Sequence, residues 1–327
     1  MTLLNAIPWR LIARLPLALA TIGVLSACLL GPDYERPQVA LPENFRAQAP
    51  AIPAANVSTE VVLTEWWTLF NDPQLNELVA HAQINNADVQ IAVARLGQAQ
   101  ALARQAGAAL YPTLNMTASG TRASSGTSVS RSGVGFQANT AQIGLVTSYE
   151  IDVWGRVRRN IESATAVATA SQYEQDSVRL TLSALVTNTY LRLRALDAQI
   201  DVVTNSVKTR ENSLRVAQAK LDGGLVSPID VSLARAAKAA SEANLSELTR
   251  QRAIVQNQLG ILTGQLQLTL APGDLRGLPI PPIPPAGLPS TLLESRPDIN
   301  RVEQELTAAN ARIGVATANF FPTLSLT

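Results

Sequence analysis

Apolar residues recur with a heptad period from Leu182 to Leu221, within a longer segment, 156–222, that contains neither proline nor glycine. Spacings of four and three residues alternate along the series, as in the seam of a coiled coil. The seam residues are Leu182, Val186, Thr189, Leu193, Leu196, Ile200, Val203, Val207, Arg210, Leu214, Ala217 and Leu221. A helix of this length extends ~100 Å at 1.5 Å per residue. The pattern therefore predicts a rod rather than part of a compact domain.

The rod is expected to turn within residues 222–228, Asp-Gly-Gly-Leu-Val-Ser-Pro. Gly223 and Gly224 suit the end of a helix, while Ser227 suits an N-cap with proline at the next position. A second helix over 228–263 should then return antiparallel to the first. Its expected seam comprises Ile229, Leu233, Ala236, Ala240, Leu245, Leu248, Val255, Leu259 and Leu262. The pattern predicts a long helical hairpin with an exposed tip.

Apolar and polar residues alternate over two other segments, 113–120 and 141–153, which predicts two β-strands. Residues 121–138 between them are mostly Ser, Gly and Thr and are expected to form a loop. Strands of this length suit a hairpin of an outer-membrane barrel. A soluble β-hairpin half-buried on a core would show the same alternation, so the pattern leaves both interpretations open.

A helix-plus-strand pattern occurs twice along the chain. Residues 74–110 predict a short and a longer helix separated by a break at 85–88, and Pro112-Thr113-Leu114 then leads into the first strand. At an offset of 210 residues, Pro322-Thr323-Leu324 repeats that exit. We interpret this as an internal repeat whose second copy stops within its strand, which predicts a complete protein roughly 130–150 residues longer.

The same patterns divide the chain into five parts. Residues 1–27 form a predicted signal peptide, and 28–73 a proline-rich, extended N-terminal arm. The first repeat, a helix, two barrel strands and the long helical hairpin, occupies 74–271. A proline-rich connector follows at 272–289, and 290–327 begin the truncated second repeat.

The N-terminal segment ends in Leu25-Ser26-Ala27-Cys28, which resembles the lipobox that bacteria cleave and acylate. Cys28 is the single cysteine of the chain, although an ordinary signal peptide followed by an incidental cysteine would look similar. Each buried CH₂ of an attached acyl chain such as palmitate contributes ~0.8 kcal/mol. Leu29 follows the cysteine, and the absence of Asp there is compatible with the outer membrane. The sequence predicts a lipid anchor at Cys28.

Charges cluster where the second strand meets the long helix. Glu150 and Asp152 share one strand face and precede Arg156, Arg158 and Arg159. We expect these groups to form ion pairs at the junction.

Composition narrows the function classes. The net charge is +1, which argues against a nucleic-acid surface. One cysteine and one histidine, His81, argue against an internal disulfide and against a zinc site. Gly223-Gly224 lacks the lysine and the spacing of a phosphate loop. With no catalytic triad or carboxylate pattern, we predict no enzyme activity, no metal and no cofactor.

Motifs along nearly the whole chain resemble the TolC-like outer membrane factors, specifically the NodT-type efflux lipoproteins of resistance–nodulation–division pump systems. These motifs are the lipobox with Gly31-Pro32-Asp33-Tyr34-Glu35-Arg36-Pro37, Trp66-Trp67 with Phe70-Asn71-Asp72-Pro73, residues 148–159, residues 224–230, Ser295-Arg296-Pro297-Asp298 and Phe321-Pro322-Thr323-Leu324. Each motif has moderate specificity, and their shared order makes the resemblance specific.

The resemblance implies an α+β membrane protein. Its fold would be a trimeric outer-membrane β-barrel continuing into a long α-helical coiled-coil barrel, with two structural repeats per chain. Such a protein is lipid-anchored in the cell outer membrane, extends into the periplasm, and passively exports drugs or other small molecules. Its partners would be two further copies of itself, a periplasmic adaptor (membrane fusion) protein and an inner-membrane resistance–nodulation–division pump. A periplasmic coiled-coil adaptor or scaffold lipoprotein without a channel is the alternative.

The family's hairpin tips bind the adaptor, and the matching residues here are Gly224, Leu225, Val226, Ser227 and Asp230. Three of them also suit local structure: the glycine a turn, the serine a cap, and the aspartate a helix N-terminus. Leu225 and Val226 suit partner contact better than turn chemistry if they are exposed.

Overall fold

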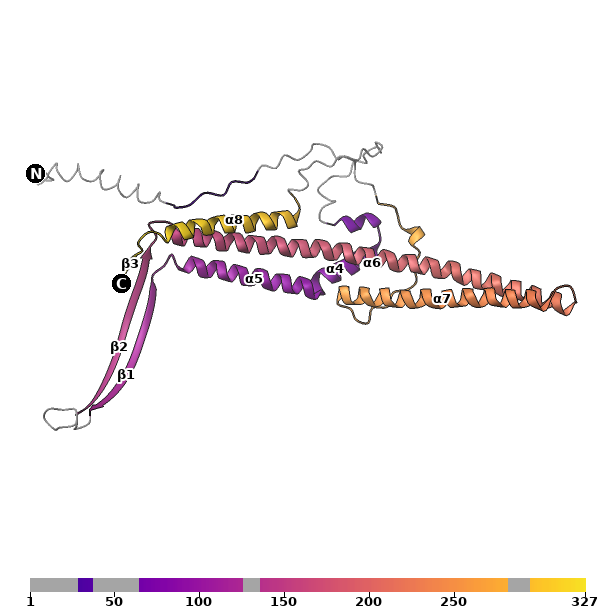
Figure 1. The fold of residues 1–327 in the computed structure, drawn as a ribbon, viewed down its shortest axis with the longest axis horizontal. Coiled ribbons are helices and arrows are strands. Elements are labelled where there is room, and N and C mark those ends of the chain that lie inside the picture. The colour runs from indigo at the N-terminus through magenta and orange to yellow at the C-terminus, as the bar shows by residue number, and fades with distance from the viewer. Residues whose placement is uncertain (1–28, 38–64, 126–135, 282–294) are drawn as a thin grey trace, which may run out of the picture. The chain divides into compact units, whose positions relative to one another are not determined.

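The structure of the chain is a computed structural model that describes residues 29–37, 65–125, 136–281 and 295–327. It contains the helices α4 (Pro73–Asn85), α5 (Ala87–Ala108), α6 (Arg156–Asp222), α7 (Pro228–Thr263) and α8 (Pro297–Ala318), the 3-10 helices η1 (Trp66–Phe70) and η2 (Leu275–Gly277), and the strands β1 (Thr113–Ser125), β2 (Phe136–Ile151) and β3 (Leu324–Leu326) (Figure 1). The predicted strand pair and long helical hairpin are both confirmed.

Contacts group the chain into two compact units, which we describe separately. The first, the sheet unit, comprises residues 1–39, 96–172 and 300–327. The second, the hairpin unit, comprises residues 40–95 and 173–299. The strands belong to the sheet unit, whereas α4, α7 and most of the α6–α7 hairpin belong to the hairpin unit.

In the sheet unit, β1 and β2 pair antiparallel from Thr113 opposite Ser148 to Ser125 opposite Phe136. β3 pairs antiparallel with the other end of β2, which gives the strand order β1-β2-β3. The ladder extends beyond the expected strands, so the prediction of a loop over 121–138 is wrong at both of its ends. Once the register is fixed, pairing continues through Thr121–Ser125 and Phe136–Ala138, although only threonine and phenylalanine among these residues favour strands.

The register places apolar residues of both strands on one face. Met116 lies opposite Leu145, and Ala118 lies opposite Ile143, while Gln142 belongs to the other face. Met116 is 73% exposed and Ile143 79% exposed. The described part of the chain therefore leaves this apolar face uncovered, and no core among the described residues half-buries the hairpin.

The main core lies in the hairpin unit, where α4, α6 and α7 pack together. Its fully buried side chains include Leu75, Val79, Val186, Tyr190, Leu193, Val255 and Leu259. The predicted break between the first two helices is confirmed at Asn86. Its side-chain amide donates to the carbonyl of Leu262 at 3.0 Å, and its side-chain oxygen accepts from the backbone amide of Asp88 at 2.8 Å. The break thus fastens the α4–α5 corner to α7.

The predicted seam of α6 is confirmed in its first half, where Leu182, Val186, Leu193 and Leu196 are buried. Toward the tip the seam positions are partly buried, apart from Arg210, which is exposed.

The predicted seam of α7 is wrong in its first half. Ile229 and Leu233 are 68% and 64% exposed, and Ala236 and Ala240 are exposed as well. The inward positions are those that continue the heptad backward from Leu245 and Leu248, namely Val231, Ala234, Lys238 and Ser241. The well-packed end of the hairpin sets the phase, and small or polar residues then occupy the seam although larger apolar residues stand nearby.

The bounds of α8 equal those of α5 shifted by 210 residues, because Ala87 corresponds to Pro297 and Ala108 to Ala318. Both helices are followed by a strand, β1 and β3 respectively. The two segments that share the sequence pattern thus share their element lengths.

Some predictions fall outside the described residues. They concern the signal peptide at 1–27, Cys28, arm residues 38–64 and connector residues 282–289. Among the helices that the structure describes, none is both long enough and apolar enough to cross a membrane.

Candidate functional site

The tip of the helical hairpin begins with a Schellman motif. The backbone amide of Gly224 donates to the carbonyl of Leu221 at 2.9 Å, and that of Leu225 donates to Lys220 at 2.8 Å. Gly224 has a φ of 70°, in the left-handed region where glycine is favoured. Gly223 does not adopt a positive φ, so only one glycine of the pair is required by the turn.

A capping box starts the returning helix. The Ser227 hydroxyl accepts from the backbone amide of Ile229 at 3.3 Å, and the Asp230 carboxylate accepts from the amide of Ser227 at 2.9 Å. Pro228 occupies the first helical position, where a missing N–H costs nothing. The structure therefore gives Gly224, Ser227 and Asp230 local roles in shaping the tip.

Apolar side chains are exposed beside this turn. Leu225 is 77% exposed, whereas Val226 is only partly exposed. Ile229 and Leu233, which sequence reasoning assigned to the seam, add to this surface and lie one helical turn apart on α7. We call Leu225, Val226, Ile229 and Leu233 the tip patch. The heptad phase of Leu245 and Leu248 is the signal that could have identified the last two.

A charged cluster spans the hairpin behind the tip. The Lys238 ammonium lies 3.3 Å from a carboxylate oxygen of Glu211 on α6 and 3.6 Å from one of Glu242 on its own helix. Hydrogen bonding to Glu211 and the charges of both carboxylates raise the pKa of Lys238 above its usual range. Lys238 occupies a seam position, so an ion pair takes the place of an apolar contact there.

The predicted ion pairs at the junction of β2 and α6 are present for Arg156 and Arg158, whereas Arg159 pairs with Asp33 and Glu162 instead. The Arg156 guanidinium donates to both carboxylate oxygens of Glu150, at 2.9 and 2.5 Å, and this bidentate pair raises the pKa of Arg156. Asp152 accepts from the backbone amides of Val157 and Arg158, both at 2.9 Å. The aspartate thus caps α6, which explains why β2 ends at Ile151 rather than at residue 153.

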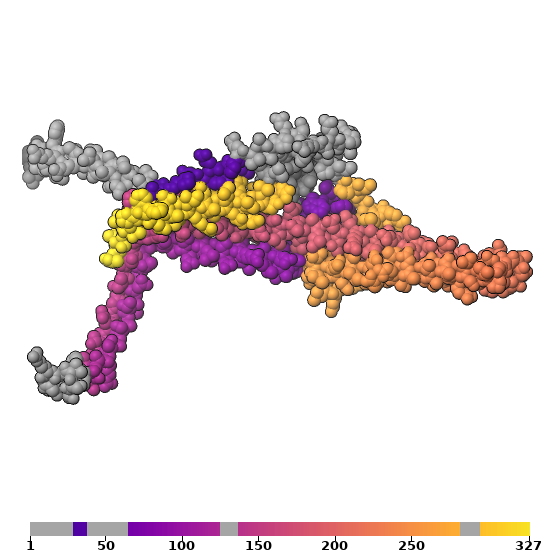
Figure 2. Space-filling view, in the orientation of Figure 1, coloured from indigo at the N-terminus to yellow at the C-terminus, as the bar shows by residue number. Residues whose placement is uncertain are grey.

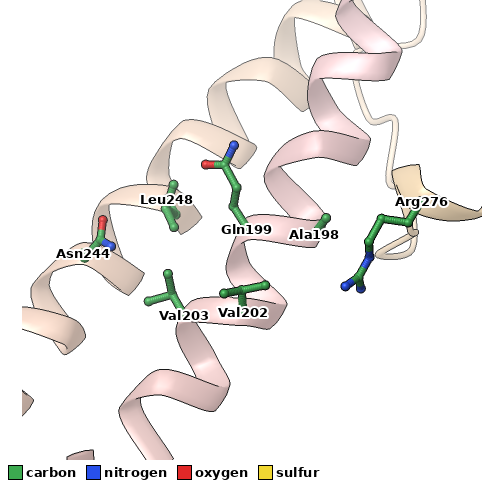
Figure 3. Close-up of a pocket in the computed structure, with 7 residues that line it drawn as sticks. All are labelled: Ala198, Gln199, Val202, Val203, Asn244, Leu248 and Arg276. Carbon is green, nitrogen blue, oxygen red and sulfur yellow. The ribbon is translucent and has the colours of Figure 1, made fainter.

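A pocket of about 330 Å³ lies between α6 and α7 beside η2. Figure 3 shows Leu248 on α7, Val202 and Val203 on α6, and Arg276 on η2 among its lining. The Arg276 guanidinium bonds Asp274 at 2.9 Å, so its charge is already paired. The pocket offers an apolar hollow without a nucleophile or a free base.

Groups suited to metal binding do not gather in the described ranges. No cluster of three or more His, Cys, Asp or Glu side chains occurs among those residues. His81 is partly exposed and lies 3.8 Å from Glu77 on the next turn of α4.

Comparison with known proteins matches this combination of a strand hairpin and a long helical hairpin to membrane channels. The family model described as "Outer membrane efflux protein" matches residues 78–265. The probable efflux pump outer membrane protein TtgC of Pseudomonas putida is 34% identical over 312 residues, which are 94% of this chain and 64% of TtgC. The pyoverdine export outer membrane protein OpmQ of Pseudomonas aeruginosa is 34% identical over 328 residues, covering 95% of this chain and 67% of OpmQ.

Solved structures agree with the family match. The open state of the Neisseria gonorrhoeae MtrE outer membrane channel superposes with a TM-score of 0.77 at 28% identity, over 91% of this chain and 65% of MtrE. The fold is therefore that of TolC-like outer-membrane channel proteins. The chain belongs to the outer membrane efflux protein family. It spans about two thirds of the length of its relatives, 64% in the case of TtgC.

Proposed function

We propose that this chain belongs to the channel subunit of a tripartite efflux pump, anchored in the outer membrane and extending into the periplasm. The uncovered apolar face of the β1–β2 hairpin carries the proposal. Met116, Ile143 and Leu145 on this face are 73%, 79% and 68% exposed, and lipid is the environment that favours such a surface. The polar face, which includes Gln142, would line an aqueous lumen.

The sheet edges support a multi-subunit barrel. The described sheet has the order β1-β2-β3, so β1 has no partner strand on its outer edge among the described residues. An open edge is not tolerated in hydrocarbon, because each unpaired backbone group loses water without gaining a partner. Closure by strands of further copies, as a homotrimer, would satisfy these edges.

The matching bounds of α5 and α8 support two structural repeats per chain. In this arrangement β3 opens the second strand pair and adds to the β1–β2 pair of the first repeat. A trimeric barrel above a coiled-coil tunnel would then carry small molecules passively outward. A periplasmic adaptor and an inner-membrane resistance–nodulation–division pump would supply the energy, and acylated Cys28 the lipid anchor.

The barrel face can be tested with a matched pair of variants in the complete protein. Ile143→Lys places a charge on the apolar face and should cost up to ~2–4 kcal/mol if that face meets the bilayer midplane. Gln142→Lys places the same charge on the opposite face and should be tolerated. The measurements are heat-resistant trimers in detergent and single-channel conductance in planar bilayers, which we expect the Ile143 variant alone to lose.

The competing scaffold function predicts another outcome. Both positions would be solvent-exposed in a protein that makes no channel, so equal tolerance of the two lysines would contradict the barrel. Absence of conductance from the unmodified, correctly trimeric protein would do the same.

We further propose that the tip patch contacts the adaptor. Gly224, Ser227 and Asp230 shape the turn, and the exposed Leu225 with its neighbour Val226 provides apolar surface for the partner. Changing Leu225 and Val226 to Asp should abolish drug export while leaving trimers intact. Ser232→Asp is the matched control, because it adds a negative charge at an exposed polar position of α7 near the tip. Loss of trimers in the double variant would instead make the patch a structural element.

A further inference from the structure

Residues 29–37, the described first part of the predicted N-terminal arm and called the arm from here on, lie extended along the surface of α8 within the sheet unit (Figures 1 and 2, indigo against yellow). At one end of the contact, Gly31 meets Gly314, and at the other end Arg36 pairs with Glu303 at 3.0 Å. Between these two contacts the arm runs five residues forward along the chain, from 31 to 36, while α8 runs eleven residues backward, from 314 to 303. An extended chain of that length spans ~17 Å and so does the helix, so the two run antiparallel in matched register.

Backbone groups of the arm are bonded along this contact. The side-chain amide of Asn310 donates to the carbonyl of Pro32 at 2.9 Å. At the start of the arm, the amide of Leu30 donates to the carbonyl of Trp154 at 3.2 Å. Leu29 packs against Gly155, the residue that immediately precedes α6. The arm is therefore held at the base of β2 as well as along α8.

Arg159 connects the arm to helix α6 through its guanidinium group. Its side chain is only 3% exposed, and its guanidinium donates to the carbonyls of Leu30 and Gly31, each at 3.3 Å. The same guanidinium bonds the carboxylate of Asp33 at 2.7 Å and that of Glu162 at 2.8 Å. A planar fork with five donors can satisfy these four acceptors at once, which a lysine ammonium cannot do in this geometry.

The position across from Arg159 must be glycine for the arm to fit. A Cβ atom on Gly314 would lie 2.7 Å from the carbonyl oxygen of Leu30 and 2.9 Å from the Cγ atom of Arg159. A Cβ atom on Gly31, whose φ is 96°, would lie 2.5 Å from the Cα atom of Gly314. The two glycines thus allow a backbone-to-backbone approach that seats the arm against the helix.

We propose that Arg159 is a positioning residue that docks the chain's own N-terminal arm between α6 and α8. Leu29 directly follows the proposed lipid attachment residue, Cys28, in the sequence, so a docked arm holds the first residue after the anchor against Gly155, beside the end of β2. This last consequence rests on the proposed function. The docking itself does not, because it concerns contacts within one chain.

Amide hydrogen exchange of the complete, detergent-solubilised protein tests the docking. In Arg159→Gln, exchange of the Leu30 amide, which donates to Trp154, should rise at least about tenfold while β1–β2 keeps its protection. Arg158→Gln is the matched control, since Arg158 bonds Asp152 and no arm residue in the structure. Arg159→Lys keeps the charge beside Asp33 and should recover part of the arm's protection.

Asp33→Asn keeps the proposal testable if the arginine variant does not fold. The Asp33 side chain is 85% exposed, so this variant leaves the core intact but removes the charged partner on the arm. Its arm should exchange faster than that of the unmodified protein. An arm that stays equally protected in Asp33→Asn and in any folded Arg159→Gln would overturn the proposal. Export is not part of this readout, so a failure here is separate from a failure of the channel function.

Discussion

The two halves of the α6–α7 hairpin follow one heptad pattern yet are stabilised differently. The proximal half, residues 178–204 and 246–263, contains Tyr190, Leu193 and Leu259 at 1% exposure or less. In the distal half, residues 205–245, which the structure describes in full, Val231 is the only buried residue. Periodicity alone therefore does not measure how firmly a coiled coil is held.

The difference comes from a third layer. In the proximal half α4 packs against α7 and contributes Leu75 and Val79 to the same core. The segment after α7 also returns to the hairpin, because Arg252 donates to the carbonyl of Leu270 at 2.9 Å. In the distal half the two helices meet without a third layer among the described residues, and α7 contributes Ala234, Lys238 and Ser241 to their seam. The comparison teaches that packing of a third layer, rather than the heptad period, determines how deeply the hairpin seam is buried.

Removing a buried charge from the proximal half should have the largest effect. The Asp197 side chain is 1% exposed and accepts from Arg194 at 3.1 Å, from Arg252 at 2.5 Å and from the backbone of Gly273 at 3.0 Å. Asp197→Asn would leave two guanidinium groups short of a counter-charge and should cost ~3–5 kcal/mol of unfolding free energy. Urea unfolding of the isolated chain, followed by circular dichroism, measures this loss.

The distal ion pair provides the matched control for that measurement. Glu211 is 62% exposed and pairs with Lys238 at 3.3 Å. Glu211→Gln should change the unfolding free energy by ~1 kcal/mol or less, because solvent screens the pair. Equal losses in the two variants would mean that the halves are stabilised alike and would refute the comparison.

Leucine truncation should give the next largest contrast. Leu259→Ala removes a fully buried side chain and should cost ~2–5 kcal/mol. Leu233→Ala removes a side chain that is 64% exposed and should change the stability of the isolated chain by ~0.5 kcal/mol or less. A loss near that of Leu259→Ala would show that the distal half has a core of its own. Both values come from the same urea titration.

Local features of this fold could be predicted from the sequence because all the residues that determine them lie within one short segment. Asp72 caps α4 with Pro73 at its first position, and Ser227 caps α7 in the same manner, as the residue types predict. The 210-residue offset likewise matched both ends of α8 to those of α5. In these cases the partners lie within a few residues of one another, or the chain repeats itself.

Features that depend on distant partners could not be predicted. Asp197 meets Gly273 and Arg159 meets Asp33, and no local period relates such positions. Arg159 was expected to pair near β2, together with its neighbours, and its tie to the N-terminal arm carried no sequence signal. The seam of α7 was predicted wrongly in its first half because its position also depends on packing elsewhere along the helix. Ile229 and Leu233 resemble core residues until the packing at Leu248 fixes the register.

The alkaline titration of a buried tyrosine should produce the smallest effect, and it belongs to the proximal half. The Tyr190 hydroxyl donates to the Asp72 carboxylate, and burial together with this bond raises the pKa of Tyr190 to about 12. Its neutral form is favoured in the folded state, so the stabilisation is complete below about pH 10 and is lost as the pH rises toward the folded pKa. Residues 205–245 contain no tyrosine and provide no such titration.

Tyr190→Phe isolates this contribution. The variant should lose ~0.5–1.5 kcal/mol at neutral pH, because the hydrogen bond to Asp72 is removed while the ring remains. It should also show a smaller fall in the urea midpoint between about pH 9 and about pH 11 than the unmodified chain shows. Tyr173→Phe, elsewhere on α6, is the matched control because it removes a tyrosine hydroxyl and leaves the Tyr190–Asp72 hydrogen bond in place. If the Tyr190 and Tyr173 variants respond to pH alike, the buried hydroxyl does not contribute to the stability of the proximal half. That stability would then come from the apolar core and the Asp197 ion pairs alone.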